Sequence, residues 1–151
     1  MLAPLLLGTA TVALSMGIQV MAVVVMVRQL IRYLTEHGLT GGFKNDAFIL
    51  SIVLTVMFVG HILQIAIWSL LFIILQEFPD FATAFYHSAV NFASLGYGDI
   101  VMSEKWRLLG ALEASNGVLM FGLTTGTLLT VMNRLFVRHK ERFETMKGGE
   151  S

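Results

Sequence analysis

The residues best suited to chemistry lie in one short run that ends in an acid, Ser94-Leu95-Gly96-Tyr97-Gly98-Asp99. Glycine accepts backbone angles that align successive carbonyl groups on one side of the chain, whereas residues with side chains resist those angles. The run lies between two hydrophobic segments that are each long enough to cross a bilayer. Irregular backbone at that depth is tolerated only where it is buried in protein or lines a space filled with water or ions. Four such strands around one axis would supply rings of oxygen atoms that replace the water shell of a cation, so the run predicts an ion-conducting pore.

The composition of the chain indicates a membrane protein. Of its 151 residues 56% are hydrophobic and only 13% are charged, and the mean hydropathy is +0.75. Soluble domains carry about 25% charged residues. The chain has no cysteine, which excludes a disulfide framework and a thiolate metal site. Its net charge of zero gives no indication of a nucleic-acid partner, and no motif indicates a protein ligand.

Three apolar segments are predicted to form membrane-spanning helices. A helix rises ~1.5 Å per residue, so about 20 apolar residues cross a ~30 Å hydrocarbon core. We expect an N-terminal helix at residues 1–34, an outer helix at 48–76 and an inner helix at 106–136, with a cytoplasmic connector at 35–47 and a short cytoplasmic tail at 137–151. The first apolar run follows no basic residue and precedes no small-residue cleavage site, which favours a retained helix over a signal peptide.

A shorter apolar segment, residues 81–93, is predicted to be a half-helix that enters the membrane and returns. Pro79 and Asp80 before it provide an entry turn and an N-cap. Its length is too small for a span, so it would lead directly into residues 94–99. The predicted fold class is therefore an all-α membrane protein with three transmembrane helices, a re-entrant pore half-helix and a filter strand.

The charged residues are segregated between the two predicted membrane faces. The face formed by the first connection and the end of the third helix carries Arg28, Arg32, Lys44, Arg134, Arg138, Lys140, Arg142 and Lys147. The opposite face collects Glu77, Asp80, Asp99 and Glu104. The positive-inside rule then places the C-terminus in the cytoplasm and the N-terminus outside. The basic tail would touch anionic membrane lipid, and the acidic outer mouth would concentrate cations.

In this setting the chain resembles the pore domain of potassium channels, whose filter usually reads Thr-Val-Gly-Tyr-Gly-Asp. The resemblance covers residues 48–136 and leaves the first helix and the last fifteen residues outside it. It implies a homotetramer in which each chain supplies one filter strand and through which K⁺ passes down its gradient. It implies no cofactor besides K⁺ as the permeant ion. The small size and the lack of cysteine favour a prokaryotic plasma membrane.

The resemblance assigns K⁺ sites to the backbone carbonyl groups of four successive residues. These are Ser94, whose hydroxyl would lie at the inner end, then Leu95, Gly96 and Tyr97. Gly98 completes the ion-binding run. The ring of Tyr97 would point away from the ions, pack against the half-helices and hold the diameter of the filter.

Three residues are expected to support the filter. Asp99 would lie at the outer mouth, bonded to an aromatic residue thirteen positions earlier, which is Tyr86. Glu113 is a carboxylate within the third span and shares a helix face with Asn116. An intramembrane carboxylate faces protein or water and has a partner, so we expect Glu113 to brace the pore loop. A proton-sensitive gate and a simple reach to the interface are its alternatives.

Several positions depart from the pattern of the family. Leu95 replaces valine, Ser94 and Ala93 replace threonines, and Val90 stands where several relatives place an acid that braces the aspartate. Leucine is less stiff at its first torsion than valine, so these changes put the degree of K⁺/Na⁺ selectivity in question. The alternatives are a non-selective cation channel and a non-conducting partner subunit of another channel.

The gating signal is not evident in the sequence. Gly117 and Gly122 are candidates for a bend in the inner helix, although glycine is also an ordinary packing residue between membrane helices. His61 and His87 are expected to pack, with pH sensing as the alternative. No span carries an arginine ladder, which excludes a voltage sensor of that kind.

An enzyme is disfavoured. Gly96 to Asp99 also matches the G-x-G-D pattern of intramembrane aspartyl proteases, but that chemistry needs two carboxylates that share a proton. Asp46 and Asp80 lie at segment boundaries, and no aspartate lies within a predicted span.

Overall fold

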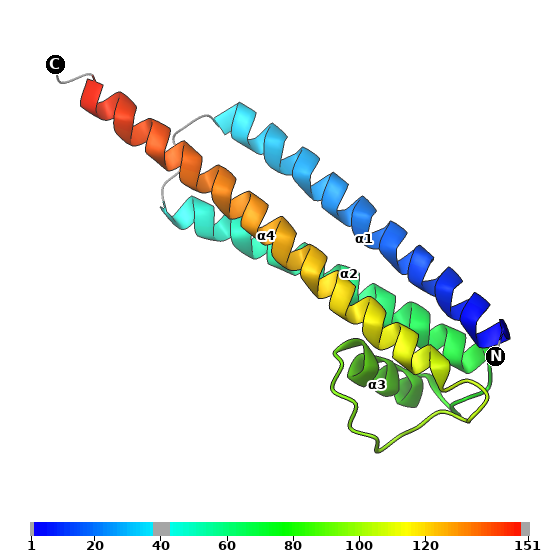
Figure 1. The fold of residues 1–151 in the computed structure, drawn as a ribbon. Helices are drawn as coiled ribbons and strands as arrows, with labels where there is room; N and C mark the ends of the chain where they lie inside the picture. Colours follow the sequence, from blue (N-terminus) through cyan, green and yellow to red (C-terminus); the bar gives the residue numbers. More distant parts are fainter. Residues whose placement is uncertain (1, 38–42, 149–151) are drawn as a thin grey trace.

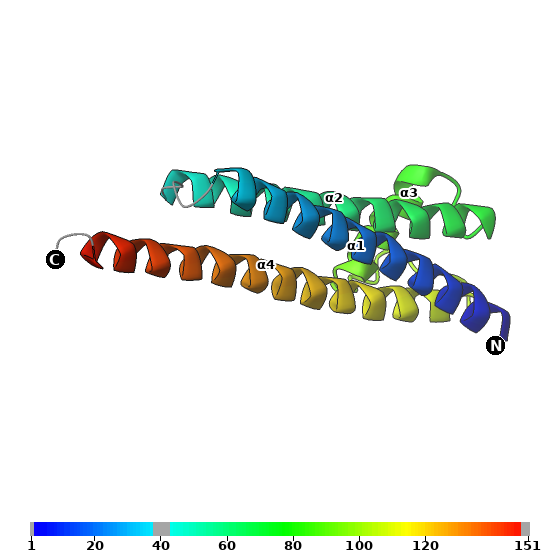
Figure 2. The ribbon, with the colours of Figure 1, turned by 90° about the horizontal axis from the view of Figure 1, so that it is seen from above.

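The computed structural model describes residues 2–37 and 43–148. The chain forms four helices, α1 (Leu2–His37), α2 (Phe43–Ile74), α3 (Phe81–Phe92) and α4 (Leu108–Gly148). The three long helices lie side by side, and the short α3 lies at the end where α1 begins and α2 ends (Figure 1). The view from above in Figure 2 shows α1 crossing between α2 and α4. The predicted fold class, with three spanning helices and one re-entrant half-helix, is confirmed.

The long helices are spans by length and composition. The membrane-crossing stretches are Leu2–Tyr33, Asn45–Ile74 and Leu108–Lys140. Hydroxyl groups within them bond to the backbone carbonyl one turn earlier, as Thr9 does to Leu5 and Thr125 to Phe121, over 2.8 and 2.9 Å. Such bonds satisfy a polar side chain without a partner outside its helix, which a hydrocarbon environment requires.

Some helix boundaries differ from the expected ones. The outer helix, expected at 48–76, begins five residues earlier at Phe43 and ends at Ile74, where Gln76 takes a positive φ of 58°. The inner helix continues without a break to Gly148, so most of the expected tail at 137–151 extends α4. Charged residues after the membrane boundary are good helix formers, which explains the continuation.

Close contacts along its length join α1 to the other long helices. Gln19 of α1 is fully buried and accepts a hydrogen bond of 2.8 Å from the Gln64 side chain of α2. Gly60 makes room for it, because a Cβ there would lie 2.7 Å from the Gln19 Oε1 atom. Nearer the start of α1, Gly8 lies against Leu112 of α4. Helix α1, which lies outside the resemblance to the potassium-channel pore domain, is thus packed against α2 and α4.

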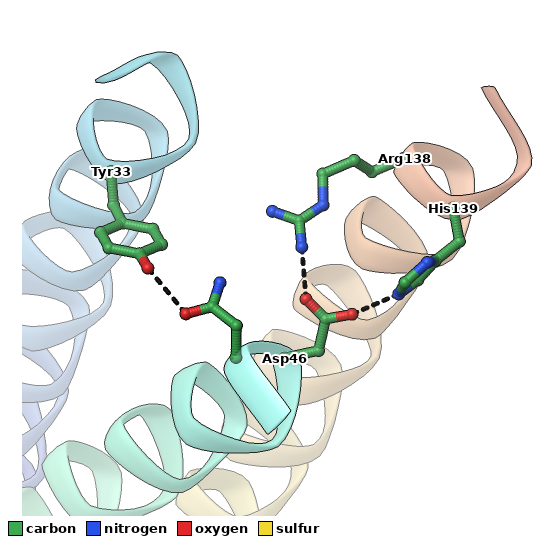
Figure 3. A network of polar contacts seen from close by, with 5 residues as sticks. Tyr33, Asp46, Arg138 and His139 are labelled. Atoms are coloured by element: carbon green, nitrogen blue, oxygen red, sulfur yellow. Dashed lines mark hydrogen bonds and ion pairs between the residues drawn. The ribbon is translucent and has the colours of Figure 1, made fainter. Parts of the chain in front are cut away.

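The opposite end of the fold is closed by a buried ion pair. Asp46 of α2 accepts hydrogen bonds from Arg138 and His139 of α4 (Figure 3). Asp46 and Arg138 are 7% and 8% exposed, so water screens their attraction little. Beside this pair, the Tyr33 hydroxyl of α1 donates to the Asn45 side chain over 2.7 Å. All three long helices therefore meet at this end.

The ion pair yields a first prediction. Asp46→Asn leaves a buried arginine without its counter-charge, which costs about 3 kcal/mol of folding free energy. We expect the variant to unfold at a lower temperature than the parent in detergent, and the charge-exchanged double variant Asp46→Arg, Arg138→Asp to regain part of the loss. Arg107→Gln, at an exposed arginine near the other end, is the control. Equal unfolding temperatures for Asp46→Asn and the parent would contradict the assigned role.

Candidate functional site

The half-helix α3 is fixed at its start by Asp80. The Asp80 Oδ1 atom accepts a hydrogen bond of 2.9 Å from the Thr83 backbone N–H, and Oδ2 accepts one of 2.8 Å from the Thr83 hydroxyl. These bonds favour the charged carboxylate and lower the pKa of Asp80. A charged N-cap also matches the positive end of the helix dipole. The helix begins where the sequence predicts.

The end of α3 is capped by the first residues of the candidate filter. Ser94 takes a positive φ of 57°, its N–H donates to Asn91 O over 2.7 Å, and the Leu95 N–H donates to Val90 O over 2.9 Å. This is the Schellman arrangement, in which a left-handed residue turns the chain and satisfies two free carbonyl groups of the helix end. Serine is uncommon at such a φ. The same turn starts residues 95–99, an irregular segment without β-structure that we call the strand.

Backbone handedness alternates along that strand. Gly96 and Gly98 have φ values of +58° and +72°, while Leu95 and Tyr97 between them do not enter the positive region. Such alternation gathers successive N–H groups on one side of the chain and leaves the carbonyl groups for the other. The side chains of Leu95 and Tyr97 are 54% and 64% exposed on the single chain.

The carboxylate that ends the run is held by the pore helix. The Tyr86 hydroxyl donates to Asp99 Oδ2 over 2.7 Å, and the Ile100 N–H donates to Oδ1 over 3.0 Å. The hydrogen bond from Tyr86 is the main cause that lowers the pKa of Asp99, and the same bond raises the pKa of Tyr86. The pair expected from the thirteen-residue spacing is present.

His87 holds the same return segment. Its Nδ1 atom lies 3.1 Å from Ile100 O, and its Nε2 atom lies 2.8 Å from the amide nitrogen of Asn91. The two partners assign the neutral tautomer that donates from Nδ1 and accepts at Nε2. Burial lowers the pKa of His87 and favours this neutral form. The imidazole thus bridges α3 and the chain beyond the filter, a role that the sequence did not indicate.

A cavity of about 430 Å³ lies behind the strand, between α3 and the start of α4. Gly96, Gly98 and Asp99 border it on the strand side, and Val90 and Asn91 border it on the helix side. Val90 is apolar, so it offers no charge to the cavity. Asp99 is supported by the hydroxyl of Tyr86 at the mouth of the strand.

Glu77 fixes the position of the loop that precedes α3. Its two carboxylate oxygens accept hydrogen bonds of 2.7 Å from the backbone N–H and the hydroxyl of Ser103. These bonds connect the chain before α3 with the chain after the filter. Glu77 and Ser103 are 26 residues apart in the sequence. No local motif links them, so the sequence did not predict this pairing.

Glu113 of α4 contacts the pore helix. Its side chain is fully buried, and the Ser88 hydroxyl of α3 donates to Oε1. The Ser88 Oγ atom also lies 3.0 Å from the Ile65 carbonyl oxygen of α2. Asn116, one turn further on, is fully buried as well. The structure therefore places Glu113 where three helices meet, away from the water interface.

The two candidate hinge glycines have different surroundings. A Cβ on Gly117 would overlap the carbonyl oxygen of Phe92 and lie 2.8 Å from its carbonyl carbon, whereas a Cβ on Gly122 would meet nothing within 4 Å. Gly117 thus lets α4 approach the end of α3, and α4 is continuous through both positions.

The ring of His61 packs against the rings of Phe92 and Phe121, at centroid distances of 5.7 and 5.2 Å.

Residues 48–134 match the family model described as an ion channel. This match covers more than half of the chain, so the chain belongs to this ion-channel family. The matched residues contain α3, the strand and nearly all of the two spans that flank them, while α1 lies outside. Comparisons with curated proteins and with solved structures gave no match.

The glycine contacts generate a second prediction. Gly117→Ala pushes a methyl group into the backbone at the end of α3, so we expect a lower unfolding temperature and a displaced filter. Gly122→Ala is the matched control, because its methyl group enters open space and alanine favours the helix by about 1 kcal/mol. Unfolding curves of the two variants in detergent make the comparison. Equal behaviour would contradict the close approach at Gly117.

The Tyr86–Asp99 bond generates a third prediction. A depressed pKa in the folded protein means that the bond stabilises the loop above the ordinary pKa of aspartate. That contribution disappears as the pH falls through the depressed value. Tyr86→Phe removes the donor, so Asp99 should titrate at a higher pH than in the parent, as measured by carbon-13 NMR of the carboxyl groups. Asp80, whose partner is Thr83, is the internal control. Identical titrations of Asp99 in both proteins would refute the bond.

Proposed function

We propose that four copies of this chain assemble around an axis and form a potassium-selective channel. The observation that carries the proposal is the alternation of positive φ at Ser94, Gly96 and Gly98, directly after a half-helix between two spans. One chain supplies one strand, so a closed ring of oxygens requires several copies, and the family pattern makes that number four. The carbonyl groups of Ser94, Leu95, Gly96 and Tyr97 then replace the water around K⁺.

The membrane setting of the proposal follows from the charges. The start of α1 and the filter lie at one end of the subunit, and the basic end of α4 lies at the other (Figure 1). By the positive-inside rule the filter end faces outward and the end of α4 faces the cytoplasm. We place the homotetramer in a prokaryotic plasma membrane.

In this proposal the polar contacts of α3 hold the diameter of the filter. Tyr86 holds Asp99 at the outer mouth, and Glu113 fixes the middle of α3 through Ser88. Gly117 lets α4 support the end of α3. A rigid filter keeps its oxygens at the spacing that suits K⁺, and a filter that yields also accepts Na⁺.

The cavity behind the strand favours one second candidate, a non-selective cation channel. Val90 brings no charge to that cavity and Leu95 is a flexible residue in place of valine. Less bonding behind the strand would let the filter widen. The same tetramer and the same oxygens serve both candidates, so the selectivity of the current separates them.

The function is tested by the reversal potential of the purified protein in planar bilayers, with K⁺ on one side and Na⁺ on the other. We expect reversal close to the potassium equilibrium potential, and block by Ba²⁺. Reversal near zero would support the non-selective candidate. Gly96→Ala should abolish the current because alanine is strained at a φ of +58°, while Gly17→Ala in α1, where a Cβ would meet nothing within 4 Å, should conduct. A verified tetramer without any current would favour a closed gate or a non-conducting partner subunit.

A further inference from the structure

A groove of about 820 Å³ runs between α1 and α4 in the half of the fold away from the filter. Val23, Val27 and Ile31 line it from α1, and Gly122, Gly126 and Arg134 line it from α4. It lies in the described part of both helices and outside every contact used by the proposed channel function. Its lining changes from apolar to basic toward the cytoplasmic end of α4.

The floor of the groove is the backbone of α4. Gly122 and Gly126 are four residues apart and face the same way, and a Cβ on either would meet nothing within 4 Å. The hydroxyl groups of Thr127 and Thr130 beside them donate to carbonyl groups of their own helix, both over 2.8 Å. The walls named here therefore present methyl and methylene groups to an occupant. Arg134, at the end of the groove, offers the hydrogen-bond donors.

The length of the groove along α4 is close to the hydrocarbon thickness of one membrane leaflet. From Gly122 to Arg134 the helix rises ~18 Å, and one leaflet of a ~30 Å hydrocarbon core is ~15 Å thick. No charged residue lies between Glu113 and Arg134, a rise of ~32 Å along α4. Arg134 therefore lies at the level of the cytoplasmic headgroups when α4 spans the core.

Arg134 is the charge at the end of the groove. It is exposed, and it makes no ion pair among the described residues, whereas Arg138 one turn further on is occupied by Asp46. None of the groove-lining residues is acidic. A guanidinium group presents several donors in a fork that suits phosphate oxygens.

We propose that this groove binds an anionic phospholipid, with one acyl chain along Gly122 and Gly126 and the phosphate on Arg134. The lipid fills the space that separates α1 from α4 and connects the helix outside the family match to the inner helix of the pore domain. This inference requires that the three helices span a membrane, and it is independent of the ion selectivity proposed above.

The proposal is tested by native mass spectrometry of the full-length protein, purified in detergent and equilibrated with phosphatidylglycerol or phosphatidylcholine. We expect the parent to retain phosphatidylglycerol in preference to phosphatidylcholine. Arg134→Gln should lower the retention of phosphatidylglycerol about tenfold, because it removes the charged hydrogen bond to the phosphate. The control Arg107→Gln, at an exposed arginine near the filter end, should retain it as the parent does.

A second variant tests the apolar part of the groove. Gly126→Leu fills the floor without a change of charge, so it should reduce the retention of both lipids while the assembly stays intact. Retention by Arg134→Gln equal to the parent, or equal retention of the two lipids by the parent, would overturn the proposal. Dissociation of the assembly by Gly126→Leu with lipid retention unchanged would also overturn it, and would identify a neighbouring subunit as the occupant. The exposed position of Arg134 keeps the first variant informative even if Gly126→Leu fails to fold.

Discussion

The structure depends on one constraint, the need of backbone polar groups for partners at membrane depth. A helix that stops inside the membrane leaves its last carbonyl groups free. At the end of α3 the N–H groups of Ser94 and Leu95 satisfy two of them and reverse the handedness of the chain. The carbonyl groups that follow, along the glycine strand, have no helical partners. In the proposed tetramer these carbonyl groups surround the ion. The turn at Ser94 therefore both caps α3 and starts the ion site.

The rest of the fold holds that turn in place. The start of α3 is fixed by Asp80, and Glu113 and Gly117 of α4 contact its middle and its end. These contacts act within one chain. The strand itself remains exposed on the single chain, with Tyr97 at 64%. In the proposed tetramer this exposed segment would meet the neighbouring copies.

The sequence predicts the parts of this arrangement that depend on local patterns. Length and hydropathy predict the three spans, and Asp80 predicts the start of α3. The bond between Asp99 and Tyr86, which the structure contains, was implied by the resemblance to the potassium-channel pore domain. The contacts that join distant segments leave no local pattern. Ser88 as the partner of Glu113 is one such contact, and Glu77 as the partner of Ser103 is another. The roles of the filter carbonyl groups and of Gly122 stay predictions, because they concern ions and movement that a single chain does not contain.

In the proposed function, the carbonyl groups of residues 94–97 from four copies surround a file of cations. The most direct measurement is the electron density of the assembled protein crystallised in thallium or rubidium, read from anomalous differences along the symmetry axis. The account predicts a four-fold axis and anomalous peaks between the levels of the Ser94 to Tyr97 carbonyl oxygens. Anomalous density absent from the axis, or an assembly in which these carbonyl groups face away from it, would contradict the account.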